Sequence, residues 1–281
     1  MLENARLLAG STWVFPGLTA SGWREGCLID TGPVEEVYEG TPIEQVVITH
    51  GHADHFSRAA ALRRAGARVI AAREEVALIE NPEVNIRGMF SWAKPSDEMV
   101  TRLFQGEGCA IDGYIDGWRG PGIEPVPLAG HTLGHTGFLT CDGVLFTGDA
   151  LYVRPMWGQH PLPYAIDVGL ALTSLRLLGT LSPDWLVPAH GEIVPGDEVG
   201  AEIAHHIGRI ESTCALVLGI LSEPRTTEAV IAQVSASLGV VENAAQYWLS
   251  VTTVKGYLAY LLERGEAEFY VESHAGWWRA I

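Results

Sequence analysis

Cysteine is scarce in this chain. Its 281 residues include four cysteines, which lie far apart and form no Cys-x-x-Cys pair; they are Cys27, Cys109, Cys141 and Cys214. This number and spacing argue against a disulfide framework, and they fit a protein of a reducing cytoplasm.

Membrane and export signals are also missing. No apolar run in the sequence is long enough to span a bilayer. Residues 1–6 do not begin a basic region followed by a long apolar core, as a secretory signal would. We therefore expect a cytoplasmic protein that does not associate with membranes.

Basic residues are few. Lys and Arg total 18 against 34 Asp and Glu, which gives a net charge of −16, and no run of Lys or Arg stands out. Because an acidic surface repels a polyanion, we expect a small-molecule substrate and not nucleic acid. A homodimer is compatible with the sequence, which leaves the oligomeric state open.

Apolar residues are plentiful, and their pattern indicates an α/β fold. They make up 47% of the chain, which is enough for a sizeable core in one large domain or in a large domain with a small one. Residues 45–49 are a β-branched run typical of a buried strand, residues 56–66 favour a helix that ends at Gly66, and residues 67–72 favour another strand. This strand–loop–helix–strand order is typical of layered α/β folds.

More strands are predicted further along the chain. Asp142-Gly143 lies between two of them and is a strong hairpin signal. Residues 81–122 are rich in glycine and aromatic residues and have weak periodicity, so this long segment is either a lid over a site or an ordinary insertion. The predicted elements are strands at residues 123–128, 136–141, 144–147 and 184–188 and a helix at residues 166–178.

The C-terminal part has a different pattern. Three stretches with helical spacing of apolar residues are followed by an alternating run and a turn, which is the order of a winged-helix domain. Residues 205–281 hold five Lys and Arg against eight Asp and Glu, whereas a DNA-reading winged helix is normally basic. We therefore predict a catalytic domain at residues 1–204 and a winged-helix-like domain at residues 205–281. The second domain would shape the substrate cleft as a cap or make a dimer contact.

The motif that carries chemistry is His50-Gly51-His52-Ala53-Asp54-His55. His50 and His52 follow a predicted strand two residues apart, so in extended geometry both rings point the same way. Asp54 and His55 lie where the next helix begins and can point to a second ion beside the first. Imidazole and carboxylate are suitable ligands for zinc and for iron or manganese.

Three further residues follow predicted strands. They are His131 in the segment Gly-His-Thr-Leu-Gly-His at residues 130–135, Asp149 in Thr-Gly-Asp-Ala at residues 147–150, and His190 in Pro-Ala-His-Gly at residues 188–191. Layered α/β folds place their sites at the C-terminal ends of strands, so these residues and the motif form one predicted metal site.

The whole set resembles the metallo-β-lactamase superfamily, whose members are hydrolases with a four-layer αββα sandwich. The motifs occur in the family's order over about residues 10–195. The resemblance implies two divalent metal ions, for which we expect zinc, with iron or manganese as alternatives. By the same resemblance His50, His52 and His131 hold one ion, Asp54, His55 and His190 hold the other, and Asp149 bridges both.

Other polar residues near these motifs receive different roles. By the same resemblance His135 supports the site and is not a ligand, and Asp30 matches the family's early strand-end aspartate, which supports the ligand loops. His205 and His206 open the first C-terminal helix, where we expect a solvated face. Tyr152 lies three residues after Asp149, and lactonases of the superfamily have there a tyrosine that contacts the substrate carbonyl; packing is the alternative role.

The ligand set indicates hydrolysis. Two ions that share a hydroxide supply a nucleophile at neutral pH, because coordination lowers the pKa of water from 15.7 to about 7. Asp54 can orient this hydroxide and carry a proton towards the leaving group. Asp149 argues against true β-lactamases, which generally lack it, whereas the glyoxalase II branch has the same ligand set but basic substrate-binding residues that find no clear match here.

Two functions of different classes follow from the sequence. The favoured one is hydrolysis of a small acyl ester, thioester or lactone, which an apolar pocket lined by Trp92, Trp118, Trp157 or Tyr164 would support. The alternative is a metal-dependent phosphodiesterase or endoribonuclease acting on nucleic acid, which a basic stripe beside the site would support. A binding or regulatory protein with a vestigial site is a third option, but a decayed site would have lost ligands.

Overall fold

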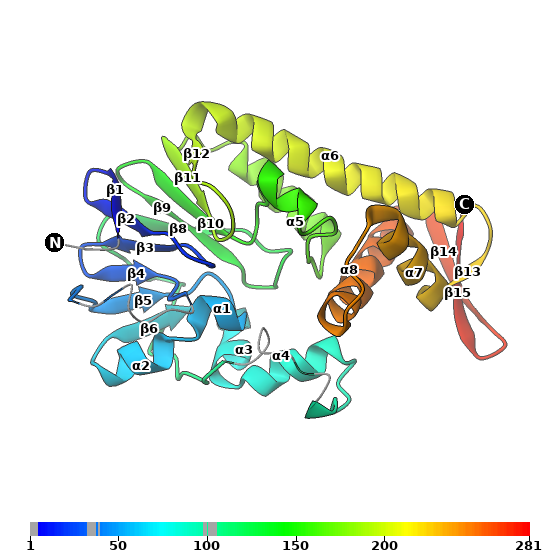
Figure 1. The fold of residues 1–281 in the computed structure, drawn as a ribbon, viewed down its shortest axis with the longest axis horizontal. Coiled ribbons are helices and arrows are strands. Elements are labelled where there is room, and N and C mark those ends of the chain that lie inside the picture. Colours follow the sequence, from blue (N-terminus) through cyan, green and yellow to red (C-terminus); the bar gives the residue numbers. More distant parts are fainter. Residues whose placement is uncertain (1–4, 33–37, 39, 98–99, 101–105) are drawn as a thin grey trace.

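The structure is a computed structural model, and it describes residues 5–32, 38, 40–97, 100 and 106–281. Its larger part contains two β-sheets with helices outside them (Figure 1). The strands predicted from the sequence are present, with ends that differ by no more than two residues. No helix among the described residues is long and apolar enough to cross a membrane.

The first sheet has seven strands in the order β1 to β7. Strands β1 to β4 pair antiparallel, and strands β4 to β7 pair parallel. The parallel half brings the C-terminal ends of β4 and β5 together, and the loops after them carry Asp30 and His50. The strands are β1 (Arg6–Ala9), β2 (Thr12–Phe15), β3 (Ser21–Arg24), β4 (Cys27–Ile29), β5 (Gln45–Val47), β6 (Arg68–Ala71) and β7 (Gly113–Tyr114).

The second sheet has five strands in the order β12-β11-β10-β9-β8. The hairpin predicted at Asp142-Gly143 joins β9 and β10, and Gly143 has the positive φ of 82° that this turn requires. Strand β10 pairs parallel with β11, so the loops after both strands leave the same edge. The strands are β8 (Ile123–Pro127), β9 (Thr136–Thr140), β10 (Val144–Gly148), β11 (Trp185–Pro188) and β12 (Val194–Pro195).

Three buried clusters define four layers. Val47 of the first sheet and Phe146 of the second belong to one cluster between the sheets. Phe56 belongs to a cluster that covers the outer face of the first sheet, and Leu175 of α5 (Val168–Leu178) to one that covers the second. Because burial of apolar surface is the main stabilising contribution, this arrangement explains the apolar content of the chain. The predicted αββα sandwich is confirmed.

The helix predicted at residues 56–66 is two helices, α1 (Ala53–Phe56) and α2 (Ala59–Arg64). The backbone N–H of Arg58 donates to the hydroxyl of Thr31 at 3.1 Å, and the Ser57 hydroxyl donates to the carbonyl of Gly32 at 3.2 Å. The Arg58 N–H therefore bonds to the loop after β4 in place of the hydrogen bond that would continue α1. The single-helix prediction was therefore wrong at this break.

The segment at residues 81–122 contains more order than its composition indicates. Helix α3 (Val76–Glu80) is followed by α4 (Pro82–Met89), in which Pro82 takes the first position and the Asn81 side chain accepts from the Glu83 N–H at 3.2 Å. Residues 98–99 and 101–105 of the segment lie outside the described residues. Its action as a lid stays a prediction.

The C-terminal part has the predicted order of three helices and a hairpin. Helix α6 begins at Gly196, with Asp197 and Glu198 in its first turn, so the predicted boundary between residues 204 and 205 lies within this helix. One continuous buried cluster includes Leu145 of the second sheet, Val199 and Val217 of α6, and Val254 of α8. The division into domains and the winged-helix-like character stay predictions. The elements are α6 (Gly196–Ile220), β13 (Arg225–Thr226), α7 (Thr227–Leu238), α8 (Ala244–Glu263), β14 (Ala267–Glu272) and β15 (Ala275–Ala280).

Candidate metal centre

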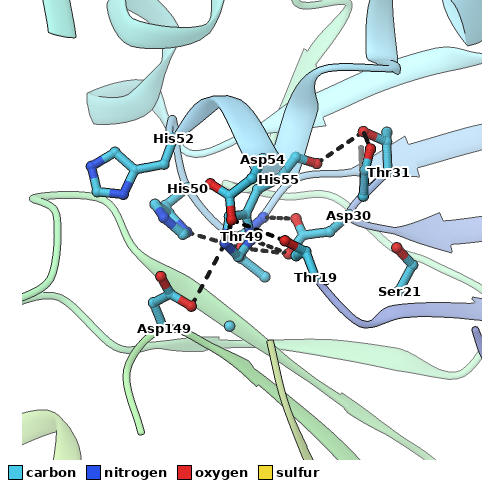
Figure 2. A network of polar contacts seen from close by, with 12 residues as sticks. Thr19, Ser21, Asp30, Thr31, Thr49, His50, His52, Asp54, His55 and Asp149 are labelled. Atoms are coloured by element: carbon cyan, nitrogen blue, oxygen red, sulfur yellow. Dashed lines mark hydrogen bonds and ion pairs between the residues drawn. The ribbon is translucent and has the colours of Figure 1, made fainter. Parts of the chain in front are cut away.

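The structure brings together all seven predicted ligands. They lie in loops that leave the strands of both sheets and in α1, and Figure 2 shows several of them pointing into one space. Their donor atoms form two groups, each with atoms within 4.8 Å of one another. One group is His50, His52, His131 and Asp149, and the other is Asp54, His55 and His190.

Nitrogen atoms converge in the first group. His131 Nε2 lies 3.0 Å from His52 Nδ1, and it lies 3.4 Å from Oδ2 of Asp149. His50 is fully buried, and its Nε2 has no hydrogen-bond partner among the residues that the structure describes. A buried nitrogen without a partner is costly in a protein interior, and a cation would remove that cost.

The second group faces the other oxygen of Asp149. Oδ1 of Asp149 lies 3.4 Å from Nε2 of His190 and 3.6 Å from Nε2 of His55. Asp54 Oδ2 lies 3.3 Å from His190 Nε2 and 3.6 Å from His55 Nε2. Asp149 therefore lies between the two groups, with one carboxylate oxygen towards each.

The remaining ring nitrogens are held by the protein. His55 Nδ1 lies 2.7 Å from Asp30 Oδ2, His131 Nδ1 lies 2.9 Å from the carbonyl oxygen of Tyr164, and His190 Nδ1 lies 2.7 Å from that of Leu18. These contacts direct the opposite nitrogen of each ring towards the acidic residues, as is usual for histidines that bind metals.

Asp30 supports the ligand loop, as predicted. One oxygen accepts from the Thr49 N–H at 2.8 Å, and the other accepts from the Thr49 hydroxyl at 2.7 Å (Figure 2). Asp30 has a φ of 52°, a left-handed backbone conformation that is unusual outside glycine. Such local strain persists only where surrounding contacts stabilise it, and here these contacts position His55.

His135 lies beside the two groups and belongs to neither. Its Nε2 accepts a hydrogen bond from the backbone N–H of Asp149 at 3.0 Å. Gly148, with a φ of 52°, makes this approach possible, because a Cβ atom there would lie 2.7 Å from the same nitrogen. This contact supports the backbone of Asp149, and the expectation that His135 is not a ligand stays a prediction.

Glu75 is a further supporting residue that the sequence did not reveal. Its carboxylate is fully buried and accepts from the backbone N–H of Gly51 and from that of Gly134, each at 2.7 Å. Glu75 thereby joins the loop of His50 and His52 to the loop of His131. Burial raises the pKa of this carboxyl group. No sequence pattern around Glu75 indicates this role, because its two hydrogen-bond partners are backbone N–H groups, which nearly every residue type offers.

Burial keeps the histidines of the first group neutral. It is the largest cause that lowers the pKa of His50, His52 and His131, and the pKa of His52 falls to about 3. A neutral imidazole retains the lone pair that a metal requires.

Carboxylates have the opposite effect in the second group. Burial alone would lower the pKa of His190, but Asp149 and Asp54 raise it to about 9. In turn, burial would raise the pKa of Asp54 and Asp149, but the neighbouring His55 and His190 lower it. Both carboxyl groups are therefore ionised at neutral pH, which is the form that binds cations.

A cavity of about 370 Å³ opens onto both groups. Tyr164 lines it, as predicted, but Trp92, Trp118 and Trp157 do not. Trp118 belongs to the cluster between the sheets, and Trp92 is 68% exposed. The apolar part of the wall comes instead from leucine, methionine and proline side chains. They are Leu18, Met89, Met156, Leu162, Pro163 and Leu249.

Tyr152 lines the same cavity and is buried. Burial raises the pKa of its hydroxyl, and the nearby Asp149 and Asp54 raise it further, so the hydroxyl stays protonated at neutral pH. The side chain packs near Trp157, with ring centroids 6.3 Å apart. Tyr152 thus lines the cavity and packs beside Trp157, and its role as a donor to the substrate stays a prediction.

His206 is buried, and the prediction of a solvated face was wrong for it. Its ring contacts Trp157 at 5.0 Å between centroids, and its Nδ1 accepts from the backbone N–H of Tyr152 at 3.3 Å. One turn earlier in α6, buried Glu202 accepts from the backbone N–H of Arg154 at 2.8 Å. The face of α6 that carries both residues therefore packs on the loop after β10. The sequence analysis placed His206 near the start of a helix, whereas α6 begins at Gly196 and His206 lies within it.

Two solved structures match nearly the whole of this chain, and a third matches about three quarters of it. A metallo-beta-lactamase family protein from Thermus thermophilus matches with a TM-score of 0.68 and 16% identity over 95% of this chain and 93% of that chain. A beta-lactamase domain protein from Burkholderia ambifaria matches with a TM-score of 0.68 and 18% identity, over 96% and 86%. A metallo-beta-lactamase from Pontibacter korlensis matches with a TM-score of 0.53 and 15% identity, over 74% and 98%. At these identities the likeness concerns the fold.

The family assignment comes from the sequence. Residues 16–190 match the sequence model of the metallo-beta-lactamase superfamily, and this range includes every residue of the two ligand groups. The chain therefore belongs to the metallo-beta-lactamase superfamily of metal-dependent hydrolases.

Proposed function

We propose that this protein is a dinuclear hydrolase of a small acyl ester, thioester or lactone. The observation that carries the proposal is the position of Asp149, whose two oxygens face different histidines, His131 on one side and His190 on the other. The donor set of imidazoles and carboxylates suits two divalent cations, for which we propose zinc, with iron or manganese as alternatives. When bound, such ions acidify a coordinated water and polarise the acyl oxygen under attack.

Asp54 is our candidate for proton transfer. It lines the cavity, and its Oδ2 accepts a hydrogen bond from the Thr19 hydroxyl at 2.9 Å, which fixes the carboxylate plane. An ionised carboxylate held in this way can orient the attacking water, accept a proton from it and deliver that proton to the leaving group.

Tyr152 is our candidate for contact with the substrate carbonyl. Its hydroxyl is protonated at neutral pH and forms no hydrogen bond with another described residue. A donor that is aimed at developing negative charge stabilises the transition state, and it costs no reorganisation when it is already in place.

The lining of the cavity supports an acyl substrate over nucleic acid. None of the described residues that line it is Lys or Arg. Proteins that act on nucleic acid use such cations to neutralise phosphates, and the chain as a whole carries a net charge of −16. This combination supports a small uncharged acyl group at the site.

The experiment is an activity panel on purified protein reconstituted separately with zinc, iron and manganese. The panel contains thioesters, aryl esters, lactones, bis-aryl phosphodiesters and short RNA. We expect turnover of at least one acyl class, and loss of it in Asp54→Asn at unchanged folded content. Cleavage of RNA or phosphodiesters without acyl hydrolysis would overturn the proposal.

A further inference from the structure

Two helices that carry no predicted metal ligand form part of the cavity wall. Helix α4 contributes Asn85 and Met89, and helix α8 contributes Gln246 and Leu249. Each helix thus presents one amide and one apolar side chain to the cavity that contains Asp54 and Asp149.

The two helices pack together, so this wall is already formed. Phe90, directly after α4, packs against Trp248 of α8 with ring centroids 4.3 Å apart and ring planes tilted by 43°, and Figure 1 shows one end of α8 next to α4. Met89 and Phe90 form a buried cluster with Ile86, Tyr164, Ala245, Trp248 and Leu249 around them. A preformed wall costs a ligand less ordering entropy than a mobile one.

The Asn85 side chain lines the cavity, and the protein leaves its amide free to bond there. Only 8% of Asn85 is exposed, and no hydrogen bond joins its amide to another described residue, but the amide is open to the cavity and not among the buried unsatisfied groups. On the outer face of the same helix, Arg87 donates to Glu83 at 2.9 Å, so α4 has its charged pair in solvent and turns Asn85 and Met89 inward. A ligand oxygen that reaches this amide can therefore bond to it without breaking a hydrogen bond within the protein.

The side chains that α4 and α8 contribute to the cavity wall are uncharged, which favours an uncharged substrate group beside them. Gln246 is half-buried and uncharged, and among the described lining residues the carboxylates are Asp54 and Asp149 of the ligand groups. An anionic group placed against α4 and α8 would be desolvated without a cationic partner, which is unfavourable. An uncharged hydroxyl or carbonyl oxygen can instead bond to an amide, which both donates and accepts.

We propose that Asn85 is a specificity-determining residue that hydrogen-bonds to an uncharged hydroxyl or keto oxygen on the acyl chain of the substrate. Met89 and Leu249 contact the methylene groups beside that oxygen. The substrate class is thus an uncharged, oxygen-substituted acyl ester or lactone, not an acyl group on an anionic carrier. This inference rests on the proposed function, since it assumes an acyl substrate at this site. The contact with Asn85, however, affects how tightly the substrate binds and can be measured without hydrolysis.

The test compares lactones whose side chains have equal length, either plain or with one hydroxyl at successive carbons. Lactam analogues of the same compounds, which resist hydrolysis, report binding by calorimetry. The proteins are the metal-loaded wild type, Asn85→Leu, and Gln233→Leu as a matched control, because Gln233 is an exposed amide in α7. Thermal unfolding verifies that each variant is folded.

In the wild type we expect one hydroxylated compound to be preferred about tenfold, both in kcat/KM and in lactam affinity. Asn85→Leu should abolish this preference by weakening the hydroxylated member alone, and Gln233→Leu should retain it. A side chain ending in a carboxylate should bind more weakly than the plain one.

The inference is overturned if Asn85→Leu keeps the preference, if the wild type has none at any hydroxyl position, or if the carboxylate binds best. Should the wild type bind the lactams with an Asn85-dependent preference but hydrolyse no acyl compound, the recognition role stands and the proposed reaction is wrong.

Discussion

Oδ2 of Asp30 lies 2.7 Å from Nδ1 of His55, and both groups are buried. This contact links the loop after β4 to helix α1 and turns Nε2 of His55 towards Asp149. A residue outside the ligand groups thus determines how one of their members is presented.

Asp30→Asn should therefore weaken metal binding. Asparagine tolerates the left-handed backbone of residue 30, but its amide group would face one of the donors that Asp30 accepts from. We expect the affinity for one of the two ions to fall by about 10- to 100-fold, as is usual when such support is lost. Competition with a chromophoric chelator measures it. Asp116→Asn, a change at an exposed pair with Arg73, is the control, and equal affinities in both variants would contradict the role.

Glu75 should contribute to stability and to site geometry at once. In Glu75→Gln the amide would direct an N–H group at the Gly51 or the Gly134 N–H, which leaves one buried donor unsatisfied. We expect a loss of about 1–3 kcal/mol in the free energy of unfolding. Urea titration measures this, with Glu74→Gln as the control because Glu74 is exposed. The same loss in both variants would rule out a specific role for Glu75.

His206 should make the unfolding free energy depend on pH. Burial lowers its folded-state pKa from 6.5 to about 3, so the folded protein binds fewer protons than the unfolded chain between these values. Its contribution is fully present above pH 6.5 and is lost as the pH falls, at about 1.4 kcal/mol per pH unit. Urea titrations at several pH values should show this slope in the wild type and a shallower one in His206→Phe. Parallel slopes would show that His206 is not buried as a neutral ring.

Tyr152→Phe separates a catalytic donor from a packing residue. The ring is retained, so a packing role predicts unchanged kinetics, whereas loss of the hydroxyl should lower kcat with little change in KM. We expect a decrease of about 10- to 100-fold for the best acyl substrate. Tyr114→Phe, at a side chain 41% exposed on β7, should leave kcat unchanged.

The residues that meet in the two groups could be named from the sequence because each has a local signal. His50 to His55 form one short motif, and Asp149 directly follows a strand that its apolar run reveals. The alternation of strands and helices similarly indicated the sandwich, since period and turn residues act over short distances.

Residues that act through distant contacts could not be predicted. Glu75 bonds to the main chain of Gly134, 59 positions away, and any residue type offers the same N–H. Asn85 and His206 acquire their positions from the packing of α4 on α8 and of α6 on the loop after β10. The start of α6 at Gly196 was missed although Asp197 and Glu198 mark it, because the apolar spacing that was followed begins later.

The most direct test of the account is the metal-to-protein ratio of the purified protein and of Asp149→Asn, measured by elemental analysis after equilibration with excess zinc and removal of loosely bound ions. Because Asp149 presents one oxygen to each group, we predict two ions per wild-type chain and at most one in the variant, with loss of acyl hydrolysis. One ion in the wild type, or two in both proteins with equal activity, would contradict a dinuclear centre bridged by Asp149.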